Sequence, residues 1–441
     1  MISATPMAAI EKEGLGSAYY MVWLGQFVSS FGTMLTTFAL GVWLFQRTGS
    51  VLDFSTMIAF STLPALLLLP WTGGFADRND KRTILIACDS SAALCIGTVG
   101  LLVWSGHFAL WHLYAVQAVL SIGIAFQGPA AYVTITKLVP RSQLGRASGM
   151  FALSSAVSQL AAPLVAASLL SAIQLQGIVL IDLLTFAAAL LGLVLAKFPP
   201  TLGPVAAGTA RRTLFHDAEQ AIGFFEKHPT LAMLFGYMSM GGFLLGCVIV
   251  LVTPMVLSRH SEQVLAWISS SGALGGVGSG IAMVAWGGPR RWTPALLALN
   301  LVGGLAVALA GYTDSVAVLC ACSFTVMFCS TMLSACAQSV WRRKVPRDRQ
   351  GSVAALQQAV ALALIPLSAI IGGVLSNYLF EPALMPGGIW ADGVGAWFGI
   401  GKGRGTGFFF FATGMLASAA ALISLSTRRL YRLEADVPDA P

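Results

Sequence analysis

Residues 73 to 82 read Gly73-Gly74-Phe75-Ala76-Asp77-Arg78-Asn79-Asp80-Lys81-Arg82, and half of these ten residues are charged. Apolar stretches lie on both sides, at 54–72 and 83–104, and together they contain a single acid. A transmembrane helix needs about 20 predominantly apolar residues. A short charged turn between two such stretches therefore predicts a pair of membrane-spanning helices joined outside the bilayer.

The whole chain has the composition of a membrane protein. Of its 441 residues 56% are hydrophobic and 10% are charged, whereas soluble domains average about 25% charged residues. Residues 14–46 and 147–181 carry no charge at all. This composition excludes a soluble enzyme, a disordered protein and a secreted disulfide scaffold, and it predicts an all-α polytopic membrane protein.

We expect twelve transmembrane helices in two six-helix repeats. Their starts are expected near residues 18, 53, 83, 109, 146, 174, 230, 263, 293, 316, 351 and 406. Residues 1–196 would form the N-terminal half, and 197–229 a cytoplasmic linker with an amphipathic helix in which Ile222 and Phe225 share the apolar face. Residues 230–441 would form the C-terminal half, which includes an extracytoplasmic Gly-rich loop at 377–405.

Basic residues predict the orientation in the membrane, because Lys and Arg concentrate in cytoplasmic loops. With both termini in the cytoplasm, 21 of the 25 Lys and Arg residues fall on the cytoplasmic side. We therefore expect a multi-pass protein of the inner (cytoplasmic) membrane with cytoplasmic termini. The net charge of +7 follows from this asymmetry and does not indicate nucleic-acid binding.

An internal repeat supports the two halves. Val139-Pro140-Arg141 recurs as Val345-Pro346-Arg347, and a Gly follows four residues later in both places, so the offset is 206 residues. A duplicated six-helix unit is typical of parallel-repeat transporters, whose substrate site lies where the halves meet. The alternative is a chance recurrence of short Pro-Arg-Gly loops.

The turn at 73–82 resembles the signature loop of the major facilitator superfamily. Phe75 and Asp80 stand where Leu and Gly are usual in that loop. The resemblance implies alternating access by rocking of the two halves, and a cytoplasmic latch that opens and closes with it. The residues implied in the latch are Gly73, Asp77, Arg78, Lys81 and Arg82, with Arg141 of the matching loop as a partner. We expect Asp77 near the start of the third helix. The alternative is a solvated charged turn.

Further stretches resemble the drug:proton antiporter branch that contains macrolide efflux proteins and the enterobactin exporter. They are residues 40–50, 63–65 and 138–141, Asp89, and Ile181-Asp182. The fifth helix keeps Pro163 of the G-P-x-x-G-G element of such antiporters, with Ala in place of each Gly. The resemblance implies proton-driven export of a small amphipathic compound such as a drug, a siderophore or a peptide natural product. An importer of a small metabolite remains an alternative.

Two acids inside the apolar segments are candidates for proton coupling. A carboxylate at the bilayer centre costs roughly 3 kcal/mol, so intramembrane acids are often functional. Asp89 and Asp182 could bind and release a proton, since burial disfavours the charged form. The alternative for Asp89 is pairing with the nearby basic loop, and for Asp182 a hydrogen bond to a neighbouring helix.

Neutral polar residues on helix faces are candidates for the substrate pathway. Side chains spaced by three or four residues share one helix face. The candidates are Gln26, Ser30 and Thr33 in the first helix, Gln117 and Ser121 in the fourth, and Gln338 and Gln357 in the second half. The alternative for each is an interhelical hydrogen bond.

Catalytic and metal-binding patterns are missing from the sequence. A membrane-embedded enzyme would need a nucleophile with a base or a metal cluster, and the chain has neither H-E-x-x-H nor G-x-S-x-G. All seven cysteines lie in apolar segments, which indicates packing residues. We expect no catalytic residue, no metal and no cofactor. The expected partners are a small-molecule substrate and the lipid bilayer, with the chain acting as a monomer.

Overall fold

The computed structural model describes residues 16–139, 143–196, 214–286, 289, 291–346 and 349–426. Within this part of the chain all regular elements are helices. The long helices are α1 (Ser17–Thr48), α2 (Val51–Arg78), α3 (Lys81–Trp104), α4 (Leu110–Leu138), α5 (Leu144–Leu195), α7 (Pro229–Leu257), α8 (Glu262–Trp286), α9 (Trp292–Tyr312), α10 (Val316–Lys344), α11 (Gln350–Leu375) and α14 (Arg404–Ser426). They confirm the all-α membrane fold, and they begin within two residues of the expected starts.

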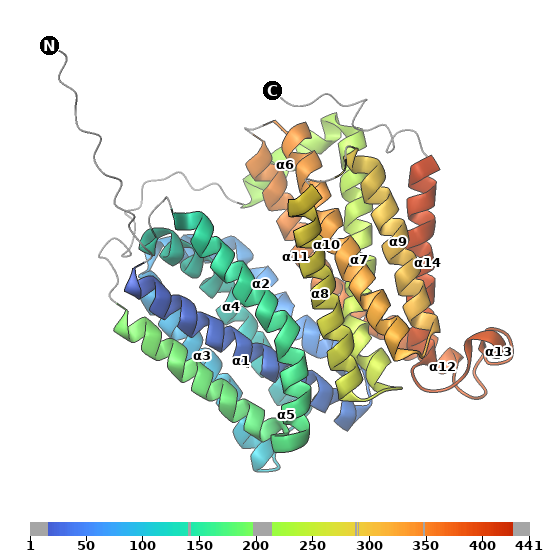
Figure 1. Ribbon diagram of the computed structural model, residues 1–441, viewed down its shortest axis with the longest axis horizontal. Helices are drawn as coiled ribbons and strands as arrows, with labels where there is room; N and C mark the ends of the chain where they lie inside the picture. Colours follow the sequence, from blue (N-terminus) through green and yellow to red (C-terminus); the bar gives the residue numbers. More distant parts are fainter. Residues whose placement is uncertain are drawn as a thin grey trace.

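Helix α5 accounts for two of the twelve expected spans. Eleven described helices are long and apolar enough to cross a membrane, and the span in α5 covers 47 residues. At 1.5 Å per residue such a helix would be about 70 Å long, more than twice the roughly 30 Å bilayer core. Gln174 breaks it with φ 57° and ψ −176°. Figure 1 shows that the chain reverses there, so α5 is a hairpin of two crossings.

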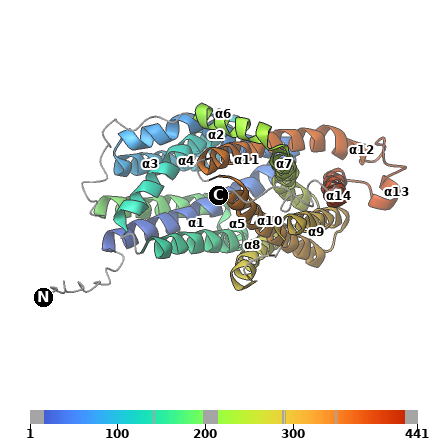
Figure 2. The same cartoon turned by 90° about the horizontal axis from the view of Figure 1, so that it is seen from above.

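The helices form two bundles. We call α1 to α5 the N-terminal bundle, and α7 to α11 with α14 the C-terminal bundle (Figure 1). Figure 2 shows α2 beside α11 and α5 beside α8, and these pairs make the main contacts between the bundles. We call the end where α1 begins the Ser17 end and the end where it finishes the Thr48 end.

Contacts between the bundles gather toward the Thr48 end. The Gln46 Nε2 donates to Glu262 Oε2 at 3.3 Å, and the Ser270 hydroxyl donates to the Leu160 carbonyl at 2.6 Å. One apolar cluster there contains side chains of both bundles, namely Val42, Phe45 and Val51 with Leu251, Met255, Leu265 and Phe409. The bundles are therefore joined by a continuous apolar core at this end.

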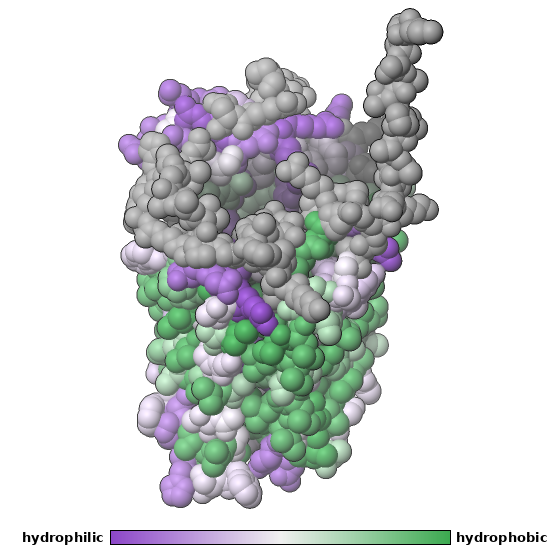
Figure 3. All heavy atoms as spheres, turned by 90° about the vertical axis from the view of Figure 1, so that its left-hand side faces the viewer, coloured by the Kyte–Doolittle hydropathy of each residue, from purple (hydrophilic) through white to green (hydrophobic). Residues whose placement is uncertain are grey.

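The outer surface carries a wide apolar band. Figure 3 shows this band over the N-terminal bundle, between polar side chains at the two ends. Exposed large apolar side chains supply it, for example Leu94, Leu101, Leu180, Leu184 and Leu191. An apolar surface of this extent would be unfavourable in contact with water, and it matches the hydrocarbon core of a bilayer. The chain is a multi-pass membrane protein.

The short helix α6 (Leu214–Lys227) precedes the C-terminal bundle and packs against α11 and α7. Ala221, Phe224 and Phe225 are buried there, and the Phe225 ring stacks on Phe235 with centroids 5.1 Å apart. Ile222, expected on the same apolar face as Phe225, is 51% exposed. The buried face is thus turned from the expected one, because tertiary contacts with the bundle select it. Residues 197–213 of the linker lie outside the described residues.

The connection at 377–405 is more regular than the expected loop. It contains a π-helix η3 (Ser376–Phe380) and two short helices, α12 (Glu381–Ala383) and α13 (Gly395–Phe398). Its rings cluster around Phe408 of α14, and they include Phe380, Trp390 and Trp397. Aromatic packing therefore orders a segment whose composition suggested an irregular loop.

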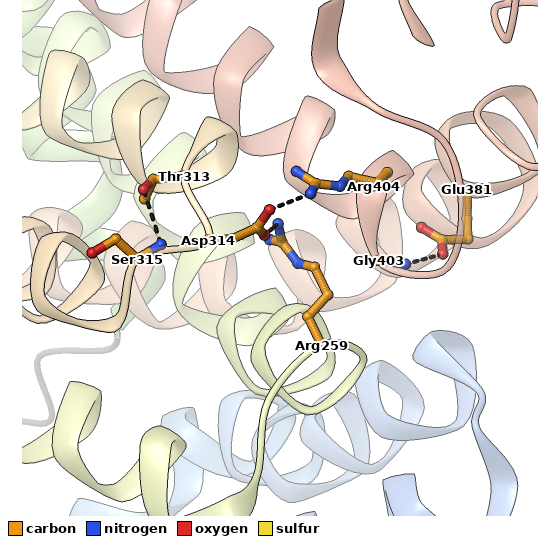
Figure 4. A network of polar contacts seen from close by, with 7 residues as sticks. All are labelled: Arg259, Thr313, Asp314, Ser315, Glu381, Gly403 and Arg404. Atoms are coloured by element: carbon orange, nitrogen blue, oxygen red, sulfur yellow. Dashed lines mark hydrogen bonds and ion pairs between the residues drawn. The ribbon is translucent and has the colours of Figure 1, made fainter.

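A polar network fixes this connection to the turns of the C-terminal bundle (Figure 4). Asp314, between α9 and α10, binds Arg259 Nη1 at 2.7 Å through one oxygen and Arg404 through the other. Burial lowers the pKa of Arg259, and the charge of Asp314 opposes that shift. Glu381 accepts hydrogen bonds from the Thr406 N–H at 3.0 Å and hydroxyl at 3.2 Å. The positive end of the helix dipole at the N-terminus of α14 also stabilises a carboxylate at this position.

Candidate functional site

The charged turn at 73–82 lies at the Ser17 end. Asp77 falls in the last turn of α2 and not near the start of α3, which corrects the expectation. The acid that begins α3 is Asp80, whose carboxylate accepts hydrogen bonds from Thr83 N at 3.0 Å and Thr83 Oγ1 at 2.8 Å. Asp80 is thus an N-cap. The side chains of Asp77 and Arg78, the surroundings of Gly73, and Arg141 lie outside the described residues.

Two basic residues of the turn, Lys81 and Arg82, lie against the N-terminal bundle. Lys81 is fully buried. Arg82 donates from Nε to the Leu193 carbonyl at 3.1 Å and from Nη2 to the Val194 carbonyl at 2.6 Å. These are among the last carbonyls of α5, where cationic side chains are favourable. Arg82 therefore ties α3 to α5 in this conformation, and the latch between the halves stays a prediction.

Asp89 lies in α3 and joins three helices of the N-terminal bundle. It is 3% exposed. Gln26 Nε2 of α1 donates to its Oδ2 at 3.0 Å, and Gln127 Nε2 of α4 donates to its Oδ1 at 2.7 Å. The structure thus brings together a proton-coupling candidate, Asp89, and a pathway candidate, Gln26. Both carboxylate oxygens have an amide donor.

Asp182 has a different environment in the second leg of α5. It is 0% exposed and packs against α1, where an added Cβ on Gly32 would lie 2.8 Å from its Oδ1. The Thr185 hydroxyl lies 2.7 Å from the Asp182 backbone carbonyl and 3.2 Å from Oδ1, so its single proton is shared between these two acceptors. The other oxygen, Oδ2, is buried and has no hydrogen bond of full geometry among the described residues, although the Thr36 hydroxyl of α1 lies close enough to interact with this carboxylate.

The other polar candidates of the N-terminal bundle are spread over different surroundings. Ser30 is exposed and Thr33 is half-buried, whereas Gln117 and Ser121 are buried. The Ser121 hydroxyl accepts a hydrogen bond from the Ala65 N–H at 3.1 Å and so joins α4 to α2. The pathway role of these four residues stays a prediction.

A cavity of about 680 Å³ lies inside the C-terminal bundle. Its described lining comes from α7, α9, α10, α11 and α14, and it extends inward from Arg342 and Gln350 at the Ser17 end. Gln338 and Gln357, both predicted pathway residues, line it together. The Gln357 Nε2 is buried and has no hydrogen-bond partner among the described residues. The volume is within the range of about 300–1,000 Å³ for small-molecule sites.

The cavity also contains a polar residue that the sequence analysis missed. Asn300 of α9 donates from Nδ2 to the Tyr237 hydroxyl of α7 at 2.6 Å, and both residues line the cavity. The repeat could have revealed Asn300. Tyr237 follows Gln26 by 211 residues, and Asn300 follows Asp89 by the same 211 residues. The Val-Pro-Arg loops differ by 206 residues, so an alignment of the halves on those loops does not bring the two pairs into correspondence.

Metal-binding geometry is not found in the described residues. They contain no group of three or more His, Cys, Asp or Glu side chains that could hold an ion. All seven cysteines are free, and each lies in an apolar helix. The described lining of the cavity offers hydrogen-bonding groups and apolar side chains, with Arg342 at the Ser17 end.

Two bundles of membrane-spanning helices with a cavity that reaches one end define a multi-pass membrane transporter. The family model of the Major Facilitator Superfamily matches residues 22–369. The chain belongs to this superfamily. Its members are transporters and not enzymes, and they typically need no cofactor.

Curated relatives extend the comparison. Macrolide efflux protein A of Streptococcus pyogenes is 29% identical over 181 residues, which are 41% of this chain and 45% of that protein. The protein of the same name from Enterococcus faecalis is 29% identical over 33% of this chain and 45% of its own length. The uncharacterized MFS-type transporter YfiS of Bacillus subtilis is 26% identical over 80% of this chain and 85% of its own. The matched regions thus span less than half the length of each of the two macrolide efflux proteins.

Solved structures share the fold. A bacterial homologue of the human lysosomal transporter Spinster, inward-facing and unoccupied, has a TM-score of 0.68 at 17% identity and covers 95% of this chain and 99% of its own. The nucleoside transporter NupG has a TM-score of 0.65 at 14% identity, with coverage of 92% and 99%. At these identities the likeness concerns the fold alone.

Proposed function

We propose that the protein exports a small amphipathic compound, such as a drug, a siderophore or a peptide natural product, and that a proton gradient drives it. The observation that carries the proposal is the 680 Å³ cavity, whose apolar walls hold neutral hydrogen-bonding groups. Such a lining suits a compound with a large apolar part and few charges. The similarity to macrolide efflux proteins supports export over import.

The proposed topology places the Ser17 end in the cytoplasm of a cell with an inner membrane. The 21 Lys and Arg residues assigned to that side support it. Residues 1–196 and 230–441 are then the two moving halves, and 197–229 link them. Closure at the Thr48 end, with a cavity that reaches the Ser17 end, supports an inward-facing state.

Asp89 and Asp182 are the proposed proton carriers. Both are buried acids of the N-terminal bundle, at 3% and 0% exposure. A change between the two access states would change the solvation of such an acid and so its protonation. Gly73, Asp77, Arg78, Lys81, Arg82 and Arg141 are proposed to close the cytoplasmic side when the cavity opens outward.

The test measures accumulation in drug-hypersensitive bacterial cells that express the chain. The panel contains macrolides, catecholate siderophores, lipopeptides and cationic dyes, each with and without a protonophore. We expect lower accumulation of at least one compound, and we expect the protonophore to abolish the difference. Asp89→Asn or Asp182→Asn should remove export at matched protein levels.

The control is Asp392→Asn, since Asp392 is an exposed acid in the connection before α14. This variant should export like the wild type. Increased accumulation would indicate import instead of export. Export that persists with the protonophore and in both buried-acid variants would rule out proton drive.

A further inference from the structure

The two bundles carry a hydrogen-bonded polar pair at corresponding positions of the repeat. Gln26 of α1 binds Asp89 of α3 at 3.0 Å, and Tyr237 of α7 binds Asn300 of α9 at 2.6 Å. Both residues of the second pair follow the first at an offset of 211 residues. The starts of α1 and α7 and of α3 and α9 differ by nearly the same amount. The pairs are therefore related by the duplication.

The surroundings of the two pairs differ. Asp89 is enclosed, and amides of Gln26 and Gln127 occupy both of its oxygens. Tyr237 and Asn300 instead line the cavity of the C-terminal bundle. One pair thus holds an ionisable group away from any ligand, whereas its counterpart is neutral and faces open space.

The geometry of the second pair prepares a hydrogen-bond donor. The Tyr237 oxygen accepts the hydrogen bond from Asn300, so its own O–H remains to donate, and no acceptor for it is found among the described residues. A phenol that accepts one hydrogen bond becomes a better donor for the next. In the same cavity lining the Gln357 amide nitrogen is buried and has no hydrogen-bond partner among the described residues.

The rest of the lining is mainly apolar and uncharged. Leu245, Val248, Leu299, Val307 and Val326 are among the apolar residues. Arg342 is the one charged side chain in the described lining, and it lies at the Ser17 end. A ligand that reaches Tyr237 and Asn300 therefore meets neutral donors surrounded by hydrocarbon.

We propose that Tyr237, oriented by Asn300, and Gln357 form the ligand-recognition site of the transporter. They bind a carbonyl, ester or ether oxygen of an amphipathic compound whose apolar part packs against the cavity wall. The duplicated pair is divided in function, since the N-terminal copy keeps an acid and the C-terminal copy binds the ligand. This inference rests on the proposed function and adds the position of the site and the chemistry it selects.

The test is equilibrium binding of erythromycin to the purified full-length protein in lipid nanodiscs. A neutral hydrogen bond contributes about 0.5–1.5 kcal/mol, so Tyr237→Phe should raise the Kd about 2- to 12-fold. Asn300→Leu should weaken binding similarly, because it releases the phenol from its orientation. Tyr312→Phe is the matched control: Tyr312 lies at the far end of α9, stacked on Trp397, and its Kd should equal that of the wild type.

Tyr237→Phe deletes one oxygen and carries the test if Asn300→Leu fails to fold. An unchanged Kd for Tyr237→Phe would overturn the site, even if cells export erythromycin. Wild-type protein that does not bind erythromycin would also overturn it. Failure of the proposed function has a different signature: erythromycin binding that responds to Tyr237→Phe, without protonophore-sensitive export from cells.

Discussion

The two buried acids of the N-terminal bundle differ in the donors around them. Asp89 has an amide donor on each oxygen, from Gln26 and Gln127. Asp182 has the Thr185 hydroxyl near one oxygen and, on the other, no hydrogen bond of full geometry in the described residues. Hydrogen bonds to a charged group are the strong ones in an apolar interior. Asp89 is therefore the carboxylate with the more complete set of hydrogen bonds, and Asp182 is the carboxylate with the less complete set.

This difference predicts opposite stability effects of the same substitution. Asp89→Asn places an amide against amide donors, so it should lower the free energy of unfolding by about 1–3 kcal/mol. Asp182→Asn should leave stability unchanged or raise it, because it removes a buried charge and the new amide can donate to the nearby Thr36 hydroxyl. Thermal unfolding of the two purified variants checks this. A lower midpoint for Asp182→Asn than for Asp89→Asn would contradict it.

At the scale of the element, the connection between α11 and α14 depends on one acid. Arg259 has a side chain 9% exposed, and Asp314 is its ion-pair partner in the described residues, also shared with Arg404. Three turns distant in sequence therefore meet on Asp314 (Figure 4). Glu381 then fixes the start of α14 from inside the connection.

Asp314→Asn should destabilise this end of the C-terminal bundle. Removing an acceptor from a buried donor costs about 1–3 kcal/mol, and the 48% exposure of the Asp314 side chain places the effect toward the lower value. Limited proteolysis within 377–405 and the unfolding midpoint measure it. Asp392→Asn removes an exposed acid of the same connection and should change neither quantity. Equal proteolysis of the two variants would show that the network does not hold the connection.

At the scale of the whole molecule, the closure between the bundles depends on close backbone approach. Gly373 of α11 faces Ser55 of α2, and an added Cβ would lie 2.5 Å from the Ser55 Cβ. Ser55 is fully buried in this contact. A side chain at 373 therefore cannot be accommodated unless the bundles move apart at the Thr48 end.

Gly373→Ala should shift the population toward states open at the Thr48 end. Spin labels on Gln46→Cys and Glu262→Cys, in a background without the native cysteines, report the separation, since these side chains are in contact in the closed state. We expect a longer mean distance in Gly373→Ala. Gly351→Ala, on the same helix with nothing within 4 Å of the added Cβ, should match the parent. Identical distances in the two variants would refute the steric role of Gly373.

The sequence by itself determined the membrane class and the starts of the long helices. Hydrophobic length and charge are local quantities, so the starts of α1, α7 and α10 could be placed within two residues. It also singled out Asp89, Asp182, Gln338 and Gln357 as polar groups inside apolar segments, because an ionisable or amide group among apolar residues is conspicuous; their roles stay predictions.

Only the tertiary structure decided which of these groups meet. Gln26 binds Asp89 from 63 residues away, and Asn300 binds Tyr237 at the same separation. The buried face of α6 and the order in the 377–405 connection likewise depend on partners distant in sequence. A lipid-facing and a core-facing helix surface are both apolar, so hydropathy cannot distinguish them. Helix packing makes that choice, and it brings Tyr237 and Asn300 to the wall of the cavity.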